Sequence, residues 1–394
     1  MGRGVKITDV SVVVHERHHP TGMPLPPMEM AVLRIHTDEG IEGNTFISRP
    51  GPNVTDQILQ QVKPMLLGRD PLDIGAVWHD LWARRRGMHS TVQGYIDVAL
   101  WDIAGKAAGL PIHRLLGTVR HELPAYISSW VHGDSATYAE EAAAYLDQGF
   151  CAYKLHPPTQ RRMLRGERGV TIADDIEACE LVRDQVGGEY RLMLDSAWAY
   201  SYPEAVTVGQ AIEDLGYYWY EDPLPADDIY GYRRLKQQLS IPIMATEMSE
   251  GGVYGLAPWI VQEATDFLRG DVVIKGGITG MMKIAHLAEA FQMNCEVHDA
   301  YNALNNVATL HVAMAIRNCE YYEVIVIHPP EQYDTAHFSY GLTEPIDIDA
   351  RGNAHAPTRP GLGYDIDWEL IDASRVAELR GNEIHICYRQ KVIL

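Results

Sequence analysis

Three carboxylates recur at an even spacing in the middle of the chain. Asp195, Glu221 and Glu247 each close a short apolar or aromatic run typical of a buried strand, and 26 residues separate each from the next (221 − 195 and 247 − 221). A strand, a loop and a helix of a parallel barrel need about that many residues, because eight such units take roughly 250. Carboxyl ends of consecutive barrel strands meet at one face, so the three anions are predicted to converge there. Converging anions repel one another unless a cation lies among them, and an all-oxygen site suits Mg²⁺.

A pair of basic residues is expected beside these acids. Lys154 and His156 are two residues apart on a predicted strand, so their side chains point to the same side. Basic groups that face an apolar interior are costly unless they are paired or used. We therefore predict that both face the metal site; the alternative is an edge strand with solvated basic side chains.

An aspartate and a histidine follow on the next two predicted strands. Asp271 opens one strand and His298 lies near the end of the other. On adjacent strands, Asp271 could accept a hydrogen bond from His298, which would fix the tautomer and raise the basicity of the imidazole. Glu323 could meet a substrate carboxylate or a developing enolate, or could be an ordinary cap. Lys275 is expected to be structural, because no other sign of carbonyl-condensing chemistry accompanies it.

Together these groups suit proton abstraction next to a carboxylate. The cation would neutralise the enediolate that forms, and an acid or base in position contributes about 10²–10⁴-fold. A base on each face of the substrate allows racemisation. A base on one face and an acid near the β-hydroxyl allow dehydration.

The elements that must position these residues begin with a small domain. Residues 5–14, 30–36 and 41–47 are predicted strands. The helical period that follows completes an α+β domain over residues 1–120. Between the first two strands, residues 15–28 are rich in His and Pro and are predicted to form a loop that helps to select the substrate. His19 in this loop could contact an anionic substrate or be solvated.

Strands and helices then alternate, as a (β/α) barrel over residues 121–328 requires. The strands are expected at 125–130, 151–156, 191–196, 217–222, 243–247, 270–275, 295–299 and 321–325. Helical patterns separate them. The Pro- and Gly-rich segment 329–394 is expected to pack back on the N-terminal domain.

The overall composition narrows the class of partner and the compartment. Lys and Arg number 33 against 53 Asp and Glu, and the net charge of −20 argues against nucleic acid as a partner. Five cysteines without CxxC spacing are expected to be free thiols of a cytosolic protein. The chain shows no apolar run of membrane-spanning length and no signal-peptide core at its start, so we predict a soluble, cytoplasmic protein.

These motifs resemble the enolase superfamily, and within it the mandelate racemase subgroup. The similar stretches are the helical run 99–106 with Gly109-Leu110-Pro111, the step Glu221-Asp222-Pro223, and the Gly-rich stretch 276–280. The resemblance implies an α/β fold, a (β/α)₇β TIM-like barrel under an α+β cap that the C-terminal tail completes, and a homo-oligomer. It also implies one Mg²⁺ per subunit. The residues that match the family's pattern are the metal ligands Asp195, Glu221 and Glu247, the catalytic dyad Asp271 and His298, and the strand-eight glutamate Glu323.

The chain departs from the subgroup on its second barrel strand. The usual motif is Lys-x-Lys, whereas this chain has Lys154-Leu155-His156. Lys154 keeps the first lysine, which would lie near the substrate carboxylate. His156 takes the usual position of the base and could act as a base or as an acid. Ala197, two residues after Asp195, also lacks the polar side chain that several members present there.

The resemblance implies a Mg²⁺-dependent dehydratase of a small anionic sugar acid, an aldonate or aldarate, that yields a 2-keto-3-deoxy acid. The alternative is a racemase or epimerase of an α-hydroxy acid or an amino-acid derivative. A non-catalytic binding protein on the same fold is a third reading. It is disfavoured because a binding protein has no reason to keep both a metal triad and an acid/base pair.

Overall fold

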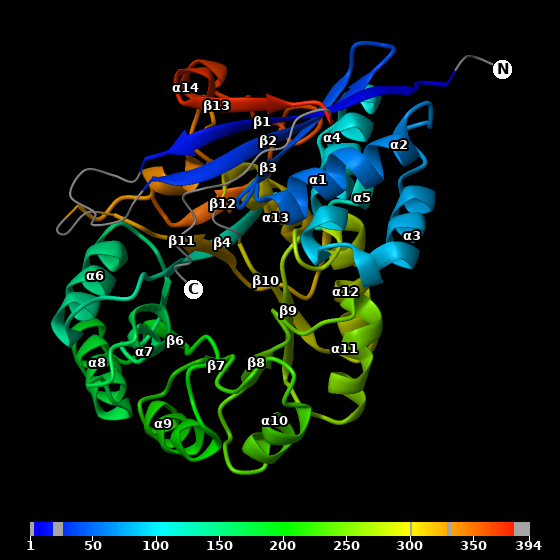
Figure 1. Ribbon diagram of the computed structural model, residues 1–394. Helices are drawn as coiled ribbons and strands as arrows, with labels where there is room; N and C mark the ends of the chain where they lie inside the picture. Colours follow the sequence, from blue (N-terminus) through cyan, green and yellow to red (C-terminus); the bar gives the residue numbers. More distant parts are fainter. Residues whose placement is uncertain (1–3, 19–26, 300–301, 329–331, 382–394) are drawn as a thin grey trace.

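The computed structural model describes residues 4–18, 27–299, 302–328 and 332–381. Within these ranges no helix is both apolar enough and long enough to cross a membrane. The chain forms an antiparallel cap sheet with its helices and a parallel barrel ringed by helices (Figure 1).

The cap sheet joins segments from both ends of the chain. Its hydrogen-bonded order is β13-β1-β2-β3. The strands are β1 (Ile7–Arg17), β2 (Met28–Thr37), β3 (Glu42–Ile47) and β13 (Arg375–Leu379). Gly40, at a φ of +75°, makes the tight turn between β2 and β3. The expectation that the C-terminal tail completes the cap is therefore confirmed by the pairing of β13 with β1.

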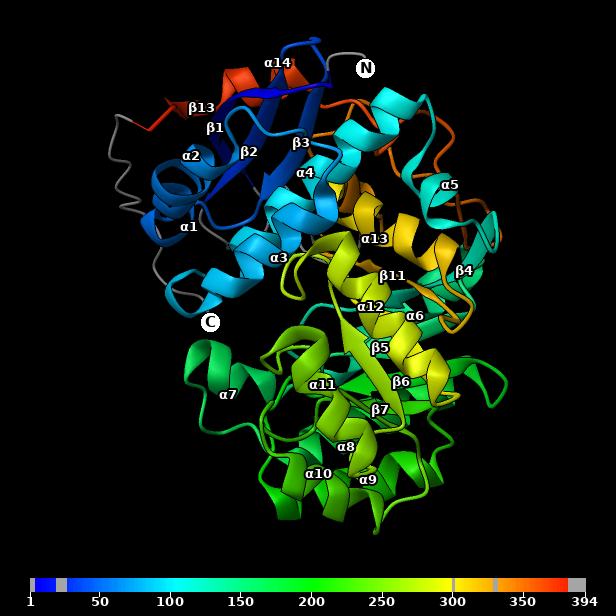
Figure 2. The same cartoon turned by 90° about the vertical axis from the view of Figure 1, so that its right-hand side faces the viewer.

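Helices follow the cap strands and connect the cap to the barrel. They are α1 (Pro52–Asp56), the π-helix η1 (Gln57–Val62), α2 (Lys63–Leu66), α3 (Ile74–Arg84), the 3₁₀-helix η2 (Arg85–Gly87), α4 (Ser90–Ala108) and α5 (Ile112–Leu116). Helix α4 packs between β3 of the cap and helix α12 of the barrel (Figure 2). A Cβ added at Gly94 of α4 would lie 2.1 Å from the carbonyl oxygen of Val273. Glycine at this position thus lets the cap approach the loop that follows Asp271.

Eight parallel strands form the barrel. They are β4 (Glu122–Ser128), β5 (Ala152–Leu155), β6 (Arg191–Asp195), β7 (Trp219–Glu221), β8 (Ile243–Ala245), β9 (Phe267–Gly270), β10 (Asn294–Val297) and β11 (Tyr322–Ile325). The hydrogen-bonded order β10-β9-β8-β7-β6-β5-β4-β11 nearly closes the ring, and β12 (Asn353–His355) pairs antiparallel with β4. The predicted barrel is confirmed.

Helices surround the ring of strands (Figure 1). They are α6 (Ser135–Asp147), α7 (Gln160–Arg165), α8 (Ile172–Val186), α9 (Tyr202–Asp214), α10 (Ile229–Lys236), α11 (Gly252–Val261), α12 (Gly277–Ala290) and α13 (Ala303–Ala315). The C-terminal segment adds the 3₁₀-helix η3 (Ala336–Ser339) and α14 (Trp368–Ala373). Capping boxes begin α8 and α9, where Thr171 pairs with Asp174 and Ser201 with Glu204.

An apolar floor fills the barrel interior. It consists of the buried cluster Tyr126, Ala152, Met193, Trp219, Met244 and Tyr321. Side chains two residues apart on a strand share a face, so Met193 and Trp219 lie directly below Asp195 and Glu221. The polar side chains at the strand ends are therefore shielded from water on the side that faces this cluster.

Two of the predicted boundaries that differ from the structure bear on the site. The sixth barrel strand ends at Gly270 instead of running from 270 to 275, so Asp271 follows its strand rather than opening it. The β-branched residues Val272, Val273 and Ile274 lie in a turn, and the real strand contains the charged Arg269, which weakens its strand pattern. Strand β1 also extends to Arg17, so His15, predicted to be in the loop, is a buried strand residue.

Candidate active site

The three evenly spaced carboxylates come together at the carboxyl ends of β6, β7 and β8. Asp195 and Glu221 are the last residues of their strands, and Glu247 lies two residues after Ala245. One oxygen from each lies within 4.8 Å of the others, and all three residues are buried. A set of donors that consists only of carboxylate oxygens fits a hard divalent cation. The triad could therefore hold a metal.

Strained backbone surrounds each of these acids. The φ angles of Ala197, Asp222 and Thr246 are +43°, +40° and +90°, a region that side chains rarely adopt. Such conformations cost about 1–3 kcal/mol each and concentrate at functional sites. Asp222 is also buried, and burial together with the Glu247, Asp195 and Glu221 charges raises its pKa well above the ordinary value.

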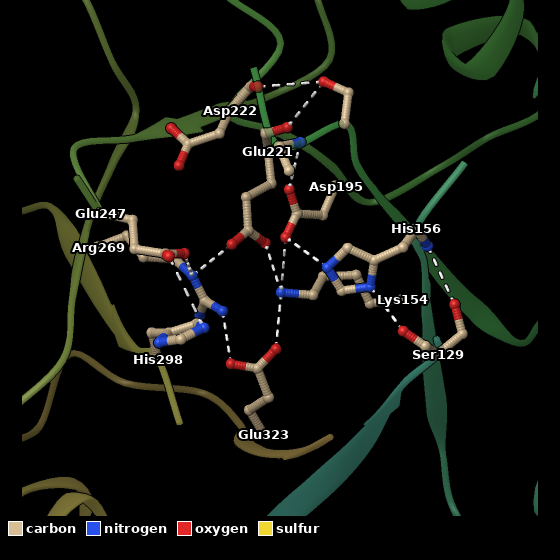
Figure 3. Close-up of polar contacts among 12 residues, drawn as sticks. Ser129, Lys154, His156, Asp195, Glu221, Asp222, Glu247, Arg269, His298 and Glu323 are labelled. Carbon is tan, nitrogen blue, oxygen red and sulfur yellow. Dashed lines mark hydrogen bonds and ion pairs between the residues drawn. The ribbon is translucent and has the colours of Figure 1, made fainter. Parts of the chain in front are cut away.

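Lys154 is fully buried and lies among three of the site's carboxylates (Figure 3). Its Nζ is 2.7 Å from Glu323 Oε1, 3.0 Å from Glu221 Oε2 and 3.4 Å from Asp195 Oδ2. Burial and the Arg269 charge both lower the pKa of Lys154, but the Glu221 and Glu323 carboxylates outweigh them and hold it well above the ordinary value. Lys154 is thus a fixed cation inside the barrel.

A second fixed cation, Arg269, was missed by the sequence analysis. Its Nε pairs with Glu221 Oε1, and its Nη2 is 2.6 Å from Glu323 Oε2. Nε also lies 3.7 Å from Glu247 Oε2. Arg269 lies two residues before Asp271, and this spacing indicates that both side chains face the barrel interior. The predicted strand began at residue 270 and therefore left Arg269 out.

Glu221 and Glu323 respond differently to these surroundings. Burial raises the pKa of Glu221, and although Arg269 and Lys154 oppose it, the Asp195 and Glu323 charges help bring the value to about 7. A cation at the triad would favour the carboxylate form. For Glu323, burial is outweighed by Arg269, Lys154 and His298, and its pKa is held well below the ordinary value.

His156 extends toward the triad from just beyond the end of β5. Its Nδ1 is 2.7 Å from the carbonyl oxygen of Ser129, so Nδ1 carries the hydrogen of that bond. The other nitrogen, Nε2, is 3.1 Å from Asp195 Oδ2. In the neutral imidazole the lone pair is therefore on Nε2 and faces the site.

Asp271 and His298 are paired, with His298 Nδ1 3.2 Å from Asp271 Oδ2. The other oxygen of Asp271 accepts hydrogen bonds from the backbone of Val273 and Ile274, each 2.7 Å long, which hold the carboxylate in place. Burial lowers the pKa of His298, but Glu247, Glu323 and the Asp271 hydrogen bond outweigh this effect and raise it to about 9. Figure 3 places His298 and His156 on opposite sides of the Lys154–Glu221 pair.

The structure describes Lys275 but not His19, the two remaining candidate residues. Lys275 is buried and donates to the carbonyl oxygen of Ser249 at 2.5 Å, and burial lowers its pKa to about 8 against nearby carboxylates. This contact is compatible with the structural role expected for Lys275. His19 lies outside the described residues.

A capped (β/α)₇β barrel with acids at successive strand ends defines a class of protein, the enolase-like barrels. Residues 137–370 match the model for the enolase C-terminal domain-like family, and residues 5–117 match the mandelate racemase / muconate lactonizing enzyme N-terminal domain. The chain belongs to this family, within the enolase superfamily. The predicted family and the prediction of an enzyme are confirmed.

Similar proteins span nearly the whole chain. A crystal structure of D-glucarate dehydratase from Agrobacterium tumefaciens complexed with magnesium is 34% identical, with a TM-score of 0.84 over 94% of this chain and 99% of that one. Arabinonate dehydratase from Saccharolobus solfataricus is 29% identical over 88% of this chain and 90% of its own. D-galactarolactone cycloisomerase from Agrobacterium fabrum is 27% identical over 95% and 100%.

Proposed function

We propose that the protein is a Mg²⁺-dependent dehydratase of a sugar acid, an aldonate or aldarate, and so a carbon–oxygen lyase. The observation that carries this proposal is the pair of imidazoles on opposite sides of an all-oxygen triad (Figure 3). The names of similar proteins, which are mostly acid-sugar dehydratases, support the same class. Asp195, Glu221 and Glu247 would hold the ion. When bound, the ion would neutralise negative charge that develops on the substrate carboxylate.

The two imidazoles have different partners, which suggests different roles. His156 bonds the backbone carbonyl of Ser129, and its other nitrogen lies 3.1 Å from Asp195, a proposed metal ligand, whereas His298 bonds Asp271, which lies outside the triad. A carboxylate that holds no cation helps the imidazole beside it to keep an extra proton. We therefore assign His156 Nε2 as the base that removes the α-proton and protonated His298 as the acid that delivers a proton to the departing β-hydroxyl. Water leaves, and the resulting enol tautomerises to the 2-keto-3-deoxy acid.

A library of mono- and diacid sugars, incubated with the purified protein and Mg²⁺, tests the assignment. We expect formation of a 2-keto acid from at least one aldonate or aldarate. Epimerisation without keto acid would instead identify the alternative, a racemase or epimerase, which the presence of a basic group on each side also favours. The homo-oligomer, the cytoplasmic location and the domain boundaries at 120 and 328 stay predictions.

Solvent deuterium exchange tests the division of labour between the histidines. In His298→Asn, His156 still removes the α-proton, so we expect the substrate α-hydrogen to exchange with solvent while no water is eliminated. His156→Ala should lose both reactions. The matched control is His286→Asn, because His286 is exposed on the outer barrel helix α12. If exchange stops in His298→Asn and survives in His156→Ala, the roles are reversed.

A further inference from the structure

A closed ring of four charged side chains adjoins the triad and shares Glu221 with it. Lys154 contacts Glu221 and Glu323, and Arg269 contacts the same two carboxylates from the other side (Figure 3). All four side chains are completely buried. Cation and anion alternate around this ring, hereafter the Lys–Arg ring, so its charges sum to zero.

The other two acids of the triad lie on the edge of the Lys–Arg ring. Asp195 Oδ2 is 3.4 Å from Lys154 Nζ, and Glu247 Oε2 is 3.7 Å from Arg269 Nε. With all four carboxyl groups ionised, as metal ligation requires of the triad, these six side chains carry four negative and two positive charges. The inner set therefore has a net charge of −2, which one divalent cation neutralises.

We propose that the Lys–Arg ring is a built-in counter-ion that leaves the ionised site at a charge of −2, and that Arg269 is a positioning residue that sets metal affinity. The proposal deepens the proposed function and rests on it only for the identity of the ion. Glu323 has its Oε1 on Lys154 and its Oε2 on Arg269 and on the backbone N–H of Asp299. It is therefore joined to the ring through both carboxylate oxygens.

Because the ring is buried, the charges of its four side chains must balance one another. Its members stand on the mainly apolar floor, which offers Glu221 one hydrogen bond, from Trp219 Nε1 to Oε2 at 3.1 Å. A buried charge without a charged partner is strongly destabilising. A guanidinium spans two carboxylates with separate nitrogens, as Arg269 does with Nε and Nη2. A lysine at this position would keep the charge with less exact geometry.

The proposal predicts changes of opposite sign in metal affinity. At separations of a few ångströms and an effective dielectric constant of about 20, one unit charge alters the binding of a divalent ion by well over tenfold. Arg269→Gln leaves the metal-free site more negative, so its dissociation constant for Mg²⁺ should fall at least about tenfold. Glu323→Gln should raise the same constant at least about tenfold. The double variant should return to within about threefold of the wild type.

Calorimetric titration of the metal-free protein with MgCl₂, without substrate, measures these constants. Arg269→Lys keeps the charge and should bind within about threefold of wild type, while Arg351→Gln, at an exposed site, is the control. The apparent Tm of metal-free Arg269→Gln should fall and recover on addition of Mg²⁺ by more than the wild type gains. This readout would not change in this way if Arg269 only filled space.

Losses of affinity in both single variants would overturn the proposal, as would unchanged affinity in Glu323→Gln. That isosteric variant decides the matter even if Arg269→Gln fails to fold. Because no substrate is present, the outcome is separate from the proposed function. If the two dissociation constants shift in opposite directions but no dehydratase activity is found, the proposal for the Lys–Arg ring holds and the proposed function fails. If dehydratase activity is found but both constants shift in the same direction, the proposed function holds and the proposal for the ring fails.

Discussion

Replacement of His298 by Asn will lower turnover by at least about 10³-fold while the protein stays folded. Positioned acid–base groups contribute about 10²–10⁴-fold, and His298 is the imidazole that a carboxylate holds in place. Asn keeps a polar group of similar size but cannot carry the proton. Steady-state kinetics with the sugar acid found by the library screen, together with the Tm of the variant, measures the effect. A variant that retains more than a tenth of wild-type turnover would contradict the role.

Asp271→Asn should lose much of the same activity, because Asp271 acts only through His298. Its Oδ1 already accepts two backbone hydrogen bonds, so the Asn amide nitrogen would face His298 and favour the wrong tautomer. Groups that act as a unit are not additive. The double variant should therefore be little worse than His298→Asn alone. Additive losses would show that the two residues act separately.

Glu221→Gln will weaken Mg²⁺ binding by at least about 100-fold, the upper end of what loss of an outer-shell partner costs a metal site. Glu221 is both a proposed ligand and a member of the Lys–Arg ring, where its oxygens contact Arg269 and Lys154. Gln keeps the shape of the side chain but removes the negative charge that attracts Arg269, Lys154 and the metal ion. Calorimetry gives the affinity, and turnover should fall to below about one per cent.

Chelation tests the same site in the unaltered protein. Turnover should vanish in excess chelator and return when Mg²⁺ is added back in excess. Both results depend on a metal at the triad and not on which sugar acid is the substrate. Full turnover in excess chelator would show that the reaction needs no metal at the triad.

The parts of this site that the sequence could predict are those that repeat along the chain. Asp195, Glu221 and Glu247 are recognisable because each ends a strand and the barrel repeat sets their spacing. Their convergence follows from the common direction of parallel strands. Lys154 and His156 were likewise predicted from their alternation on one strand.

Arg269 could not be predicted in this way. A charged residue in an apolar run normally indicates that a buried strand has ended, even when the side chain in fact faces the barrel interior. Its burial is made possible by Glu221 and Glu323, which come from strands β7 and β11 on other sides of the barrel. No local pattern records such a pairing. The same reason displaced the predicted strand toward Val272 and Val273, whose side chains favour β-structure but lie in a turn.

The long-range pairing in the cap sheet has a consequence for how the protein is made. Val12 of β1 pairs with Leu379 of β13, so 366 residues (379 − 12 − 1) are synthesised between the two partners. At about 5–20 residues per second a ribosome needs on the order of half a minute for that length. During this interval β1 lacks the neighbour that covers its edge, and an exposed edge can recruit a strand from another chain. Nascent chains should thus be most prone to aggregate before β13 emerges, and chaperone dependence should end with its arrival.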